Sequence, residues 1–263
     1  MGITFINRDL RNRSFYKQDL RDAVFDHCDL RGCDFRYAQL QGTTFQQVQF
    51  GIARRRLLAY GAIALGVAVV AFNAISHMVF GILGLTAQDP AWGFAIALYV
   101  SLAIAGLVAV PKHRLPRPMR RLAILSNIAT GALLGFYYGG SAAGEDPQVA
   151  IIAACLAGGS VGLICLARPQ SNGFVGLMTI VGAMAAYGMV FAAMGMTSAS
   201  LSTGYLLMGM GWGACALLYF VLALKALENS YQALKKAAST QFQNTDLSQT
   251  IFDEMSPAPR LLS

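Results

Sequence analysis

Acidic side chains are scarce in this chain and almost absent from its long apolar middle. The 263 residues include 13 Asp and Glu against 20 Lys and Arg. Between Leu57 and Leu224 the acidic residues are Asp89, Glu145 and Asp146, and all three stand in breaks between apolar stretches. Proton relays and cation pathways normally need ionisable groups inside the membrane. The scarcity therefore argues against a proton-driven pump.

Sequence motifs of catalysis are also missing. The chain has no Gly-rich phosphate loop, no HExxH pair and no nucleophile elbow around a serine. Its three histidines, His27, His77 and His113, are scattered over different parts of the sequence. We therefore expect no enzyme activity, no catalytic residue and no bound cofactor.

The five cysteines do not have the spacing of a metal site or a disulfide framework. Cys28 and Cys33 follow one another at five residues, whereas Cys155, Cys165 and Cys215 lie in apolar stretches. No His or Cys completes a set of zinc ligands around them. We expect no metal site and interpret the cysteines as small buried side chains.

A large apolar residue recurs at every fifth position of the first fifty. Such a period fits neither an amphipathic helix, which repeats at about 3.6 residues, nor a strand, which repeats at 2. It predicts stacked repeats whose chain turns a corner every five residues. The run alternates Phe and Leu as far as Phe45: Phe5, Leu10, Phe15, Leu20, Phe25, Leu30, Phe35, Leu40, Phe45 and Phe50.

Small residues often stand two positions before these centres, as at Ala23, Cys28 and Ala38, and Asp or Thr often stands just before them. This pattern resembles the pentapeptide-repeat family. The resemblance implies a right-handed quadrilateral β-helix over residues 1–52, with the centre and the small residue pointing inward. The first units depart from the pattern, because Arg8, Arg13 and Gln18 take the small position, and we expect those units to be frayed or open to solvent.

The same spacing returns near the C-terminus, at Phe242, Leu247 and Phe252. If four units make one coil, the N-terminal repeats end halfway round the third coil. The phase of the side-chain types places Phe252 beneath Phe45, so we predict that residues 240–254 complete this coil and that residues 255–263 form a tail. Everything between is then an insertion into one small β-helix.

The insertion, residues 53–239, reads as an α-helical polytopic membrane domain. Roughly 20 apolar residues cross the hydrocarbon of a bilayer. We predict six transmembrane helices and a cytosolic extension of the last one. The predicted spans are 57–86, 91–110, 120–140, 148–167, 173–196 and 201–227.

The distribution of Lys and Arg predicts the orientation of these spans. Arg54, Arg55 and Arg56 precede the first span, and alternate breaks collect further basic residues, which marks them as cytoplasmic. Both termini, and hence the β-helix, are expected on the cytoplasmic side. The first fifty residues are polar repeats, so no cleavable signal peptide is expected. Resemblance to membrane-bound pentapeptide-repeat proteins, common in cyanobacteria, implies a bacterial plasma or thylakoid membrane.

We expect the chain to act as a membrane-anchored scaffold, adaptor or assembly factor for protein–protein interaction. Its partners would be other membrane or cytoplasmic proteins and anionic lipids, and self-association is left open. The basic charge follows from topology and lipid, so no nucleic acid is expected. The residues predicted to bind a partner are Arg11, Lys17, Arg21, Arg31 and Arg36.

Two alternatives use other residues. In the first, the spans form a small-solute transporter or channel regulated by the β-helix, and a polar path is lined by Asn73, His77, Asn127 and Tyr137. Convergence of these side chains on one cavity would favour transport. In the second, a basic rim binds lipid headgroups through Arg54, Arg55, Arg56, Arg120 and Arg121.

Overall fold

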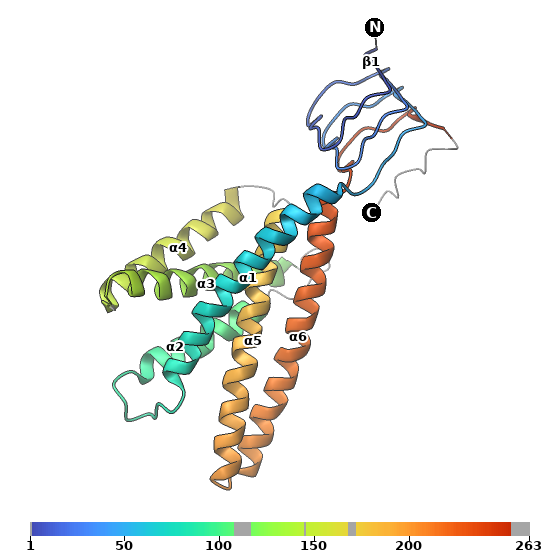
Figure 1. The fold of residues 1–263 in the computed structure, drawn as a ribbon. Coiled ribbons are helices and arrows are strands. Elements are labelled where there is room, and N and C mark those ends of the chain that lie inside the picture. Colours follow the sequence, from blue (N-terminus) through green and yellow to red (C-terminus); the bar gives the residue numbers. More distant parts are fainter. Residues whose placement is uncertain (1, 108–116, 145, 168–171, 254–263) are drawn as a thin grey trace. The chain divides into compact units, whose positions relative to one another are not determined.

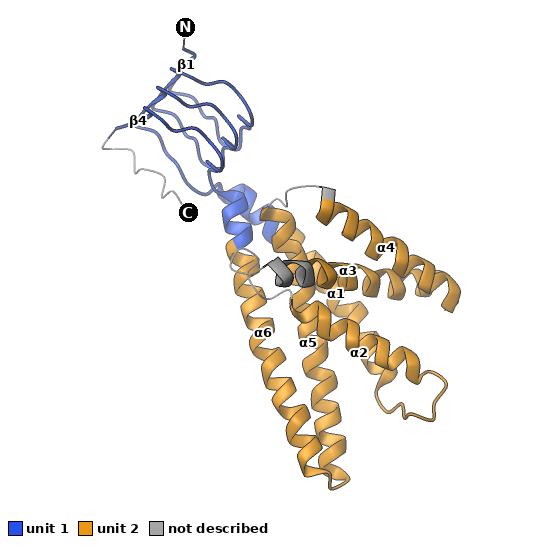
Figure 2. Cartoon of the chain, turned by 180° about the vertical axis from the view of Figure 1, so that it is seen from behind, with its two compact units in different colours: residues 1–62, 233–263 blue, residues 63–232 orange. Residues whose placement is uncertain are grey.

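A computed structural model describes residues 2–107, 117–144, 146–167 and 172–253 of the chain. The elements follow one another as three short strands, six helices and a final strand, drawn in Figure 1. Two compact units are distinguished in Figure 2. One comprises residues 1–62 and 233–263, and the other comprises residues 63–232.

The first unit contains a β-helix with one parallel sheet along one of its sides. Its strands are β1 (Thr4–Ile6), β2 (Val24–Asp26), β3 (Thr44–Gln46) and β4 (Ile251–Phe252), hydrogen-bonded in that order. Phe5 pairs with Phe25, Phe25 with Phe45, and Phe45 with Phe252. One coil therefore takes twenty residues on the N-terminal segment, and the C-terminal segment enters in the register that the five-residue spacing predicts.

Single parallel bridges form the other three sides of the coil. They join Asp9 to Asp29 and then Gln49, Ser14 to Asp34 and then Gln241, and Asp19 to Gln39 and then Asp246. Between the sides the backbone adopts a left-handed conformation two residues after most centres, which turns the chain through each corner. This corner residue explains the period of five. The non-glycine residues in this conformation include Asn7, Asn12, Lys17, His27, Tyr37 and Asn244.

Stacked rings fill the interior of the β-helix. The Phe5, Phe25, Phe45 and Phe252 rings lie 4.9–5.2 Å apart, centroid to centroid, and are nearly parallel. Phe15, Phe35 and Phe242 form the facing column. Leucines occupy the two remaining sides, except that Phe50 follows Leu10 and Leu30 on one of them, and Leu30 and Leu40 are fully buried. Such a continuous apolar core stabilises a β-helix too small to be held by its backbone hydrogen bonds alone.

Residues in the small position bond to the coil before them. The Thr43 hydroxyl donates to the Leu20 carbonyl at 2.8 Å, and the hydroxyls of Thr240, Thr245 and Thr250 donate likewise to the carbonyls of Leu30, Phe35 and Leu40. A hydroxyl in this position therefore has a hydrogen-bond partner although it points inward. This explains why Thr can take the place of Ala or Cys there.

The chain leaves the β-helix and returns to it at a single seam. Ile52 and Ser239 form an antiparallel bridge, the Ala53 N–H donates to the Ala238 carbonyl at 3.0 Å, and the Thr240 N–H donates to the Gly51 carbonyl at 3.0 Å. The β-helix is thus attached at this seam both to the first residues of helix α1 (Arg54–Ile82) and to the last residues of helix α6 (Leu206–Ala238).

The first units were expected to be frayed or open to solvent, and the structure shows the second of these alternatives. The Leu10 and Phe15 N–H groups donate to the Asp29 and Asp34 carbonyls of the next coil, so the first coil is regular. Arg8, Arg13 and Gln18 are exposed. The Arg13 guanidinium lies over the Phe15 ring at 5.5 Å and covers the end of the core. Charged residues at such an end also discourage pairing with another strand.

Six helices make up most of the chain between the two parts of the β-helix. Besides α1 and α6 they are α2 (Trp92–Gly106), α3 (Arg117–Ala142), α4 (Pro147–Ala167) and α5 (Asn172–Ser202). Within the described residues, four helices (α1, α4, α5 and α6) are long and apolar enough to cross a membrane. Figure 1 shows α5 and α6 running side by side, joined by a short turn.

The prediction of six spans differs from the structure at α2 and α3, which are not among the four helices that are long and apolar enough. Helix α2 has 15 residues, about 22 Å at 1.5 Å per residue, against roughly 30 Å of hydrocarbon. The predicted end of this span lies outside the described residues. Helix α3 carries the polar residues Ser126, Asn127 and Thr130, which lower its hydropathy.

Glycines allow α3 and α4 to approach closely. A Cβ atom built on Gly135 would lie 2.5 Å from the Ala153 carbonyl oxygen, and one on Gly139 would lie 2.2 Å from the Ala153 Cβ. Gly131 faces Val161 in the same way. Small residues four apart are a known means of packing membrane helices.

Helix α5 is the most buried of the long helices and organises the core of the second unit. Ala186 and Met189 pack there with Ile75, Val79 and Leu102. The Tyr219 hydroxyl donates to the Ala103 carbonyl at 3.0 Å, which joins α6 to α2. Long apolar side chains on the outer faces of α4 and α6 are exposed, for example Leu163 and Leu207. Faces of this kind suit lipid contact.

Candidate functional site

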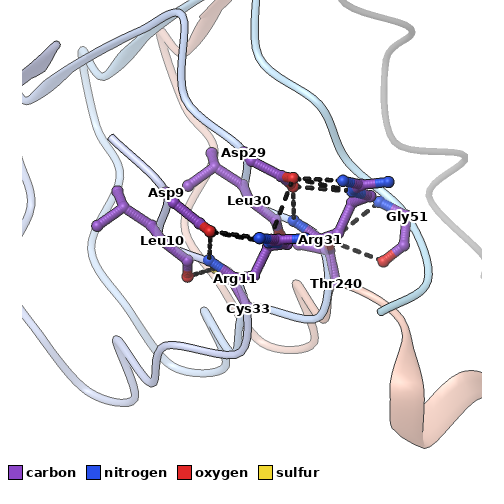
Figure 3. Close-up of polar contacts among 9 residues, drawn as sticks. All are labelled: Asp9, Leu10, Arg11, Asp29, Leu30, Arg31, Cys33, Gly51 and Thr240. Atoms are coloured by element: carbon purple, nitrogen blue, oxygen red, sulfur yellow. Dashed lines mark hydrogen bonds and ion pairs between the residues drawn. The ribbon is translucent and has the colours of Figure 1, made fainter. Parts of the chain in front are cut away.

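The surface arginines of the β-helix are paired within their own repeats. Arg11, Arg21, Arg31 and Arg36 each follow an aspartate by two residues, and each Nε donates to that carboxylate at 2.8–2.9 Å. The backbone N–H of each arginine donates to the same carboxylate. Figure 3 shows two of these pairs, Asp9–Arg11 and Asp29–Arg31, on successive coils. Four of the five residues predicted to bind a partner thus have their charge balanced locally.

These contacts change the pKa of the aspartates. Hydrogen bonds from the Arg11 side chain and backbone hold the pKa of Asp9 at about 2. Burial raises the pKa of Asp29, but the hydrogen bonds from Arg31 outweigh it, so its net shift is downward. The carboxylates are therefore ionised at neutral pH, and they compete with any acidic partner for the arginines.

The fifth predicted residue, Lys17, belongs to an exposed aromatic patch that the sequence interpretation missed. Tyr16 and Tyr37 are 42% and 44% exposed and meet edge to face, with ring centroids 5.7 Å apart. The Lys17 ammonium and the Arg36 guanidinium lie over the Tyr16 ring at 5.4 and 5.7 Å. We call Tyr16, Lys17, Arg36 and Tyr37 the Tyr16–Tyr37 patch. The sequence signal for this patch is that Tyr16 and Tyr37 stand at surface positions where other repeats carry polar residues.

A second polar feature lies where α1 leaves the β-helix. A cavity of about 610 Å³, here the arginine cavity, is lined by Asp9, Arg11, Asn12, Arg31, Ala53, Arg54 and Arg55. Of the five arginines predicted to bind lipid headgroups, Arg54 and Arg55 line this cavity. Arg56 instead donates to the Gly32 carbonyl at 3.0 Å and lies over the Tyr60 ring, so it fastens α1 to the coil. The side chains of Arg120 and Arg121 lie outside the described residues.

The helical unit holds a mostly apolar pocket of about 400 Å³ between α1, α2, α3 and α4. Two of the four residues predicted for a transport path, His77 and Tyr137, line it, and their rings stack at 5.9 Å. Ser101 is a further polar lining residue. The apolar lining includes Met78, Ile82, Phe94, Leu98, Leu133 and Phe136.

The other two predicted path residues do not line this pocket. Asn73 is exposed on α1. Asn127 is fully buried, and its amide nitrogen lies 3.5 Å from the Cys165 sulfur, while its Oδ1 has no hydrogen-bond partner among the described residues. Neighbouring Ser126 donates to the Ala105 carbonyl at 2.8 Å. The four side chains therefore do not converge on one cavity.

Within the described ranges, no three His, Cys, Asp or Glu side chains lie close enough to hold a metal ion. Cys28 and Cys33 are buried in the β-helix. The Cys33 thiol donates to the Leu10 carbonyl at 3.0 Å, and burial raises its pKa to about 12. Cys33 therefore occupies the small, inward-facing position of its repeat.

Comparison with known proteins agrees with this architecture. The family model for pentapeptide repeats matches residues 14–50 in eight copies. Repeats of this kind are protein–protein interaction modules. No curated protein and no solved structure matches the chain. Residues 14–50 are therefore pentapeptide repeats.

Proposed function

We propose that this chain is a membrane-anchored scaffold that presents its β-helix to a protein partner on the cytoplasmic side. The observation that carries the proposal is the seam, at which Ala53 bonds to Ala238 and Thr240 bonds to Gly51. The β-helix is joined to the first and the last helix at this one place. A surface joined to the helices through two paired chain segments is better fixed for recognition than one on a single flexible tether.

The contact surface proposed is the Tyr16–Tyr37 patch. Tyr and Arg are enriched at the centres of protein interfaces, and rigid aromatic rings lose little conformational entropy on binding. The Asp–Arg pairs around the rest of the coil offer less, because each arginine already has its carboxylate. Arg36 combines both roles, since it pairs with Asp34 and also covers Tyr16.

Site-specific photocrosslinking tests this surface in the native membrane. A photoreactive phenylalanine analogue replaces Tyr37, and the matched controls place it at His27 and Gln47, which share the left-handed corner position on other units. We expect one discrete crosslinked protein from position 37 and none from the controls. Equal yields from all three positions, or none from any, would refute the assignment of the patch.

The topology proposed has six spans and both termini in the cytoplasm. Geometry supports an even number of spans, because the two ends of the chain build one β-helix, and the distribution of Lys and Arg supports the cytoplasmic side. Four helices meet the length and composition needed, and α2 and α3 would supply the remaining pair. Fluorescence of a green fluorescent protein fused after Ser263 tests it, because that protein does not fluoresce when exported. A dark fusion that is exported would overturn the topology.

A second candidate function rests on the pocket lined by His77 and Tyr137. An apolar cavity of about 400 Å³ with a few polar groups is typical of small-molecule sites. The transporter reading would then use this pocket rather than a path through Asn127. Solute flux into liposomes, compared among His77→Ala, Tyr137→Phe and the control Asn73→Ala, tests it. Loss of flux only in the first two variants would favour transport.

A further inference from the structure

The arginine cavity carries more positive than negative charge. Four guanidinium groups line it, from Arg11, Arg31, Arg54 and Arg55, and Asp9 is the acidic residue of the lining. Asp29 stands beside it, bonded to Arg31 and 3.6 Å from the Arg11 Nε. Four guanidinium groups against two carboxylates leave two positive charges unbalanced.

Arg54 and Arg55 supply that surplus. Both are exposed, and within the described part of the chain neither guanidinium group has a hydrogen-bond or ion-pair partner. Their neighbour Arg56 differs, because it is bonded to the Gly32 carbonyl. Two unpaired guanidinium groups thus face a cavity whose other arginines are held in place by Asp9 and Asp29.

The donors left over suit a tetrahedral anion. Arg11 and Arg31 use Nε and Nη2 on their aspartates, so each keeps Nη1 free, and Figure 3 shows the two side chains side by side on successive coils. Asn12 adds an amide to the lining. Guanidinium groups bind phosphate with two parallel hydrogen bonds, which a lysine cannot do. Helix α1 begins at the same place, and the N–H groups of a first helical turn lack partners within the helix.

We propose that the arginine cavity binds a phosphate group, with Arg54 and Arg55 as its principal ligands and Arg11, Arg31 and Asn12 around them. Two sources offer this chemistry. One is the headgroup of an anionic phospholipid, because α1 begins at the cavity and is apolar enough to enter a bilayer. The other is free inorganic phosphate. The lipid source depends on the membrane location proposed above, whereas the phosphate source does not.

Lipid retention tests the first source. The full chain is purified in a phosphate-free sugar detergent and given equal amounts of phosphatidylglycerol and an uncharged galactolipid, and native mass spectrometry records what stays bound. We expect one phosphatidylglycerol retained in preference to the galactolipid, and about tenfold weaker retention in the double variant Arg54→Gln, Arg55→Gln. The control Lys235→Gln, Lys236→Gln removes the same charge from exposed positions of unit 1 and should retain the lipid.

Thermal stability in the same detergent tests the second source. Inorganic phosphate should raise the melting temperature of the parent chain, with chloride at equal ionic strength as the reference. If phosphate stabilises the parent and not the arginine variant, free phosphate is the ligand. If only phosphatidylglycerol shows the dependence on Arg54 and Arg55, the ligand is a lipid headgroup.

Either result supports the site. It is overturned if neither probe distinguishes the parent from the arginine variant, or if the lysine control loses binding to the same extent. The melting temperatures without ligand show that each variant is folded. Crosslinking at position 37 reads the protein-binding surface separately, so the two proposals fail independently.

Discussion

Phe45 and Phe252 stack with their ring centroids 5.2 Å apart and their planes 10° from parallel, although they lie at opposite ends of the chain. Phe252 closes the column that Phe5, Phe25 and Phe45 begin. The C-terminal repeats are therefore part of the same core as the N-terminal repeats.

Phe252→Asp should destabilise the β-helix by about 2 kcal/mol, because it removes a partly buried ring and places a charge against Phe45. Ile251→Asp is the matched control, since Ile251 is 60% exposed on the neighbouring position. Protease sensitivity of the β-helix in detergent measures the effect. A Phe252→Asp chain as resistant as the control would contradict the closure by C-terminal repeats.

Acid should weaken the β-helix between about pH 4 and pH 2. The folded pKa of Asp9 is about 2, held down first by the Arg11 hydrogen bond, against about 3.9 in an unfolded chain. A depressed pKa contributes stability above the unfolded value, and that contribution is lost as the pH falls through the folded value. The pKa values of Asp19, Asp29 and Asp34 are lowered as well.

Melting temperatures measured across this range should fall less steeply when Arg11, Arg21 and Arg31 are all replaced by Gln, since the carboxylates then lose their partners. Exposed pairs are worth little each, so the slope is the useful quantity. Arg8→Gln serves as control, because Arg8 has no acidic partner among the described residues. An unchanged slope in the triple variant would show that the pairs do not set the acid sensitivity.

Gly135→Leu should separate α3 from α4. The added side chain meets the Ala153 carbonyl oxygen and the Ala157 Cβ at less than van der Waals distance, and overpacking of this kind costs about 2 kcal/mol. Gly159→Leu on α4 is the control, because a Cβ there has open space around it. The melting temperature in detergent should fall for the first variant and stay near the parent for the second. Equal melting temperatures of the two variants would contradict the close packing of α3 against α4.

Cys33 should resist a water-soluble maleimide while the chain is folded. Burial raises the pKa of its thiol to about 12, and the thiolate is the reactive form. In a chain whose other four cysteines are replaced by Ala, labelling at about pH 8 should appear only after denaturation. Ser14→Cys, made without Cys33 in the same background, is exposed and should label at once. Rapid labelling of folded Cys33 would contradict its inward position.

Sequence reasoning was strongest where contacts repeat at a fixed spacing. The columns of Phe5, Phe25 and Phe45 follow from twenty residues per coil, and the bounds of α4 follow from apolar length, whereas α5 continues six residues beyond its predicted end. It failed where a contact is local and polar. Arg11 was predicted to bind a partner, although its Nε donates to the carboxylate of Asp9, two residues before it.

The pocket of the helical unit could not be predicted in the same way. His77 and Tyr137 come from different helices and meet only through tertiary packing. Asn127, assigned to the same path, lies against Cys165 instead. A single sequence gives the face of a helix on which a residue lies, but not the helix that the face meets.

The seam also sets an order for biosynthesis. Phe35, Phe45 and Phe50 emerge from the ribosome before the last helix exists, whereas their partners Phe242 and Phe252 follow that helix in the chain. The half-built third coil therefore keeps an open edge until the six helices have been made. The coil can close only after α6 has been made, and a nascent chain that stalls before then keeps an unpaired strand edge and exposed apolar rings that chaperones and proteases can detect.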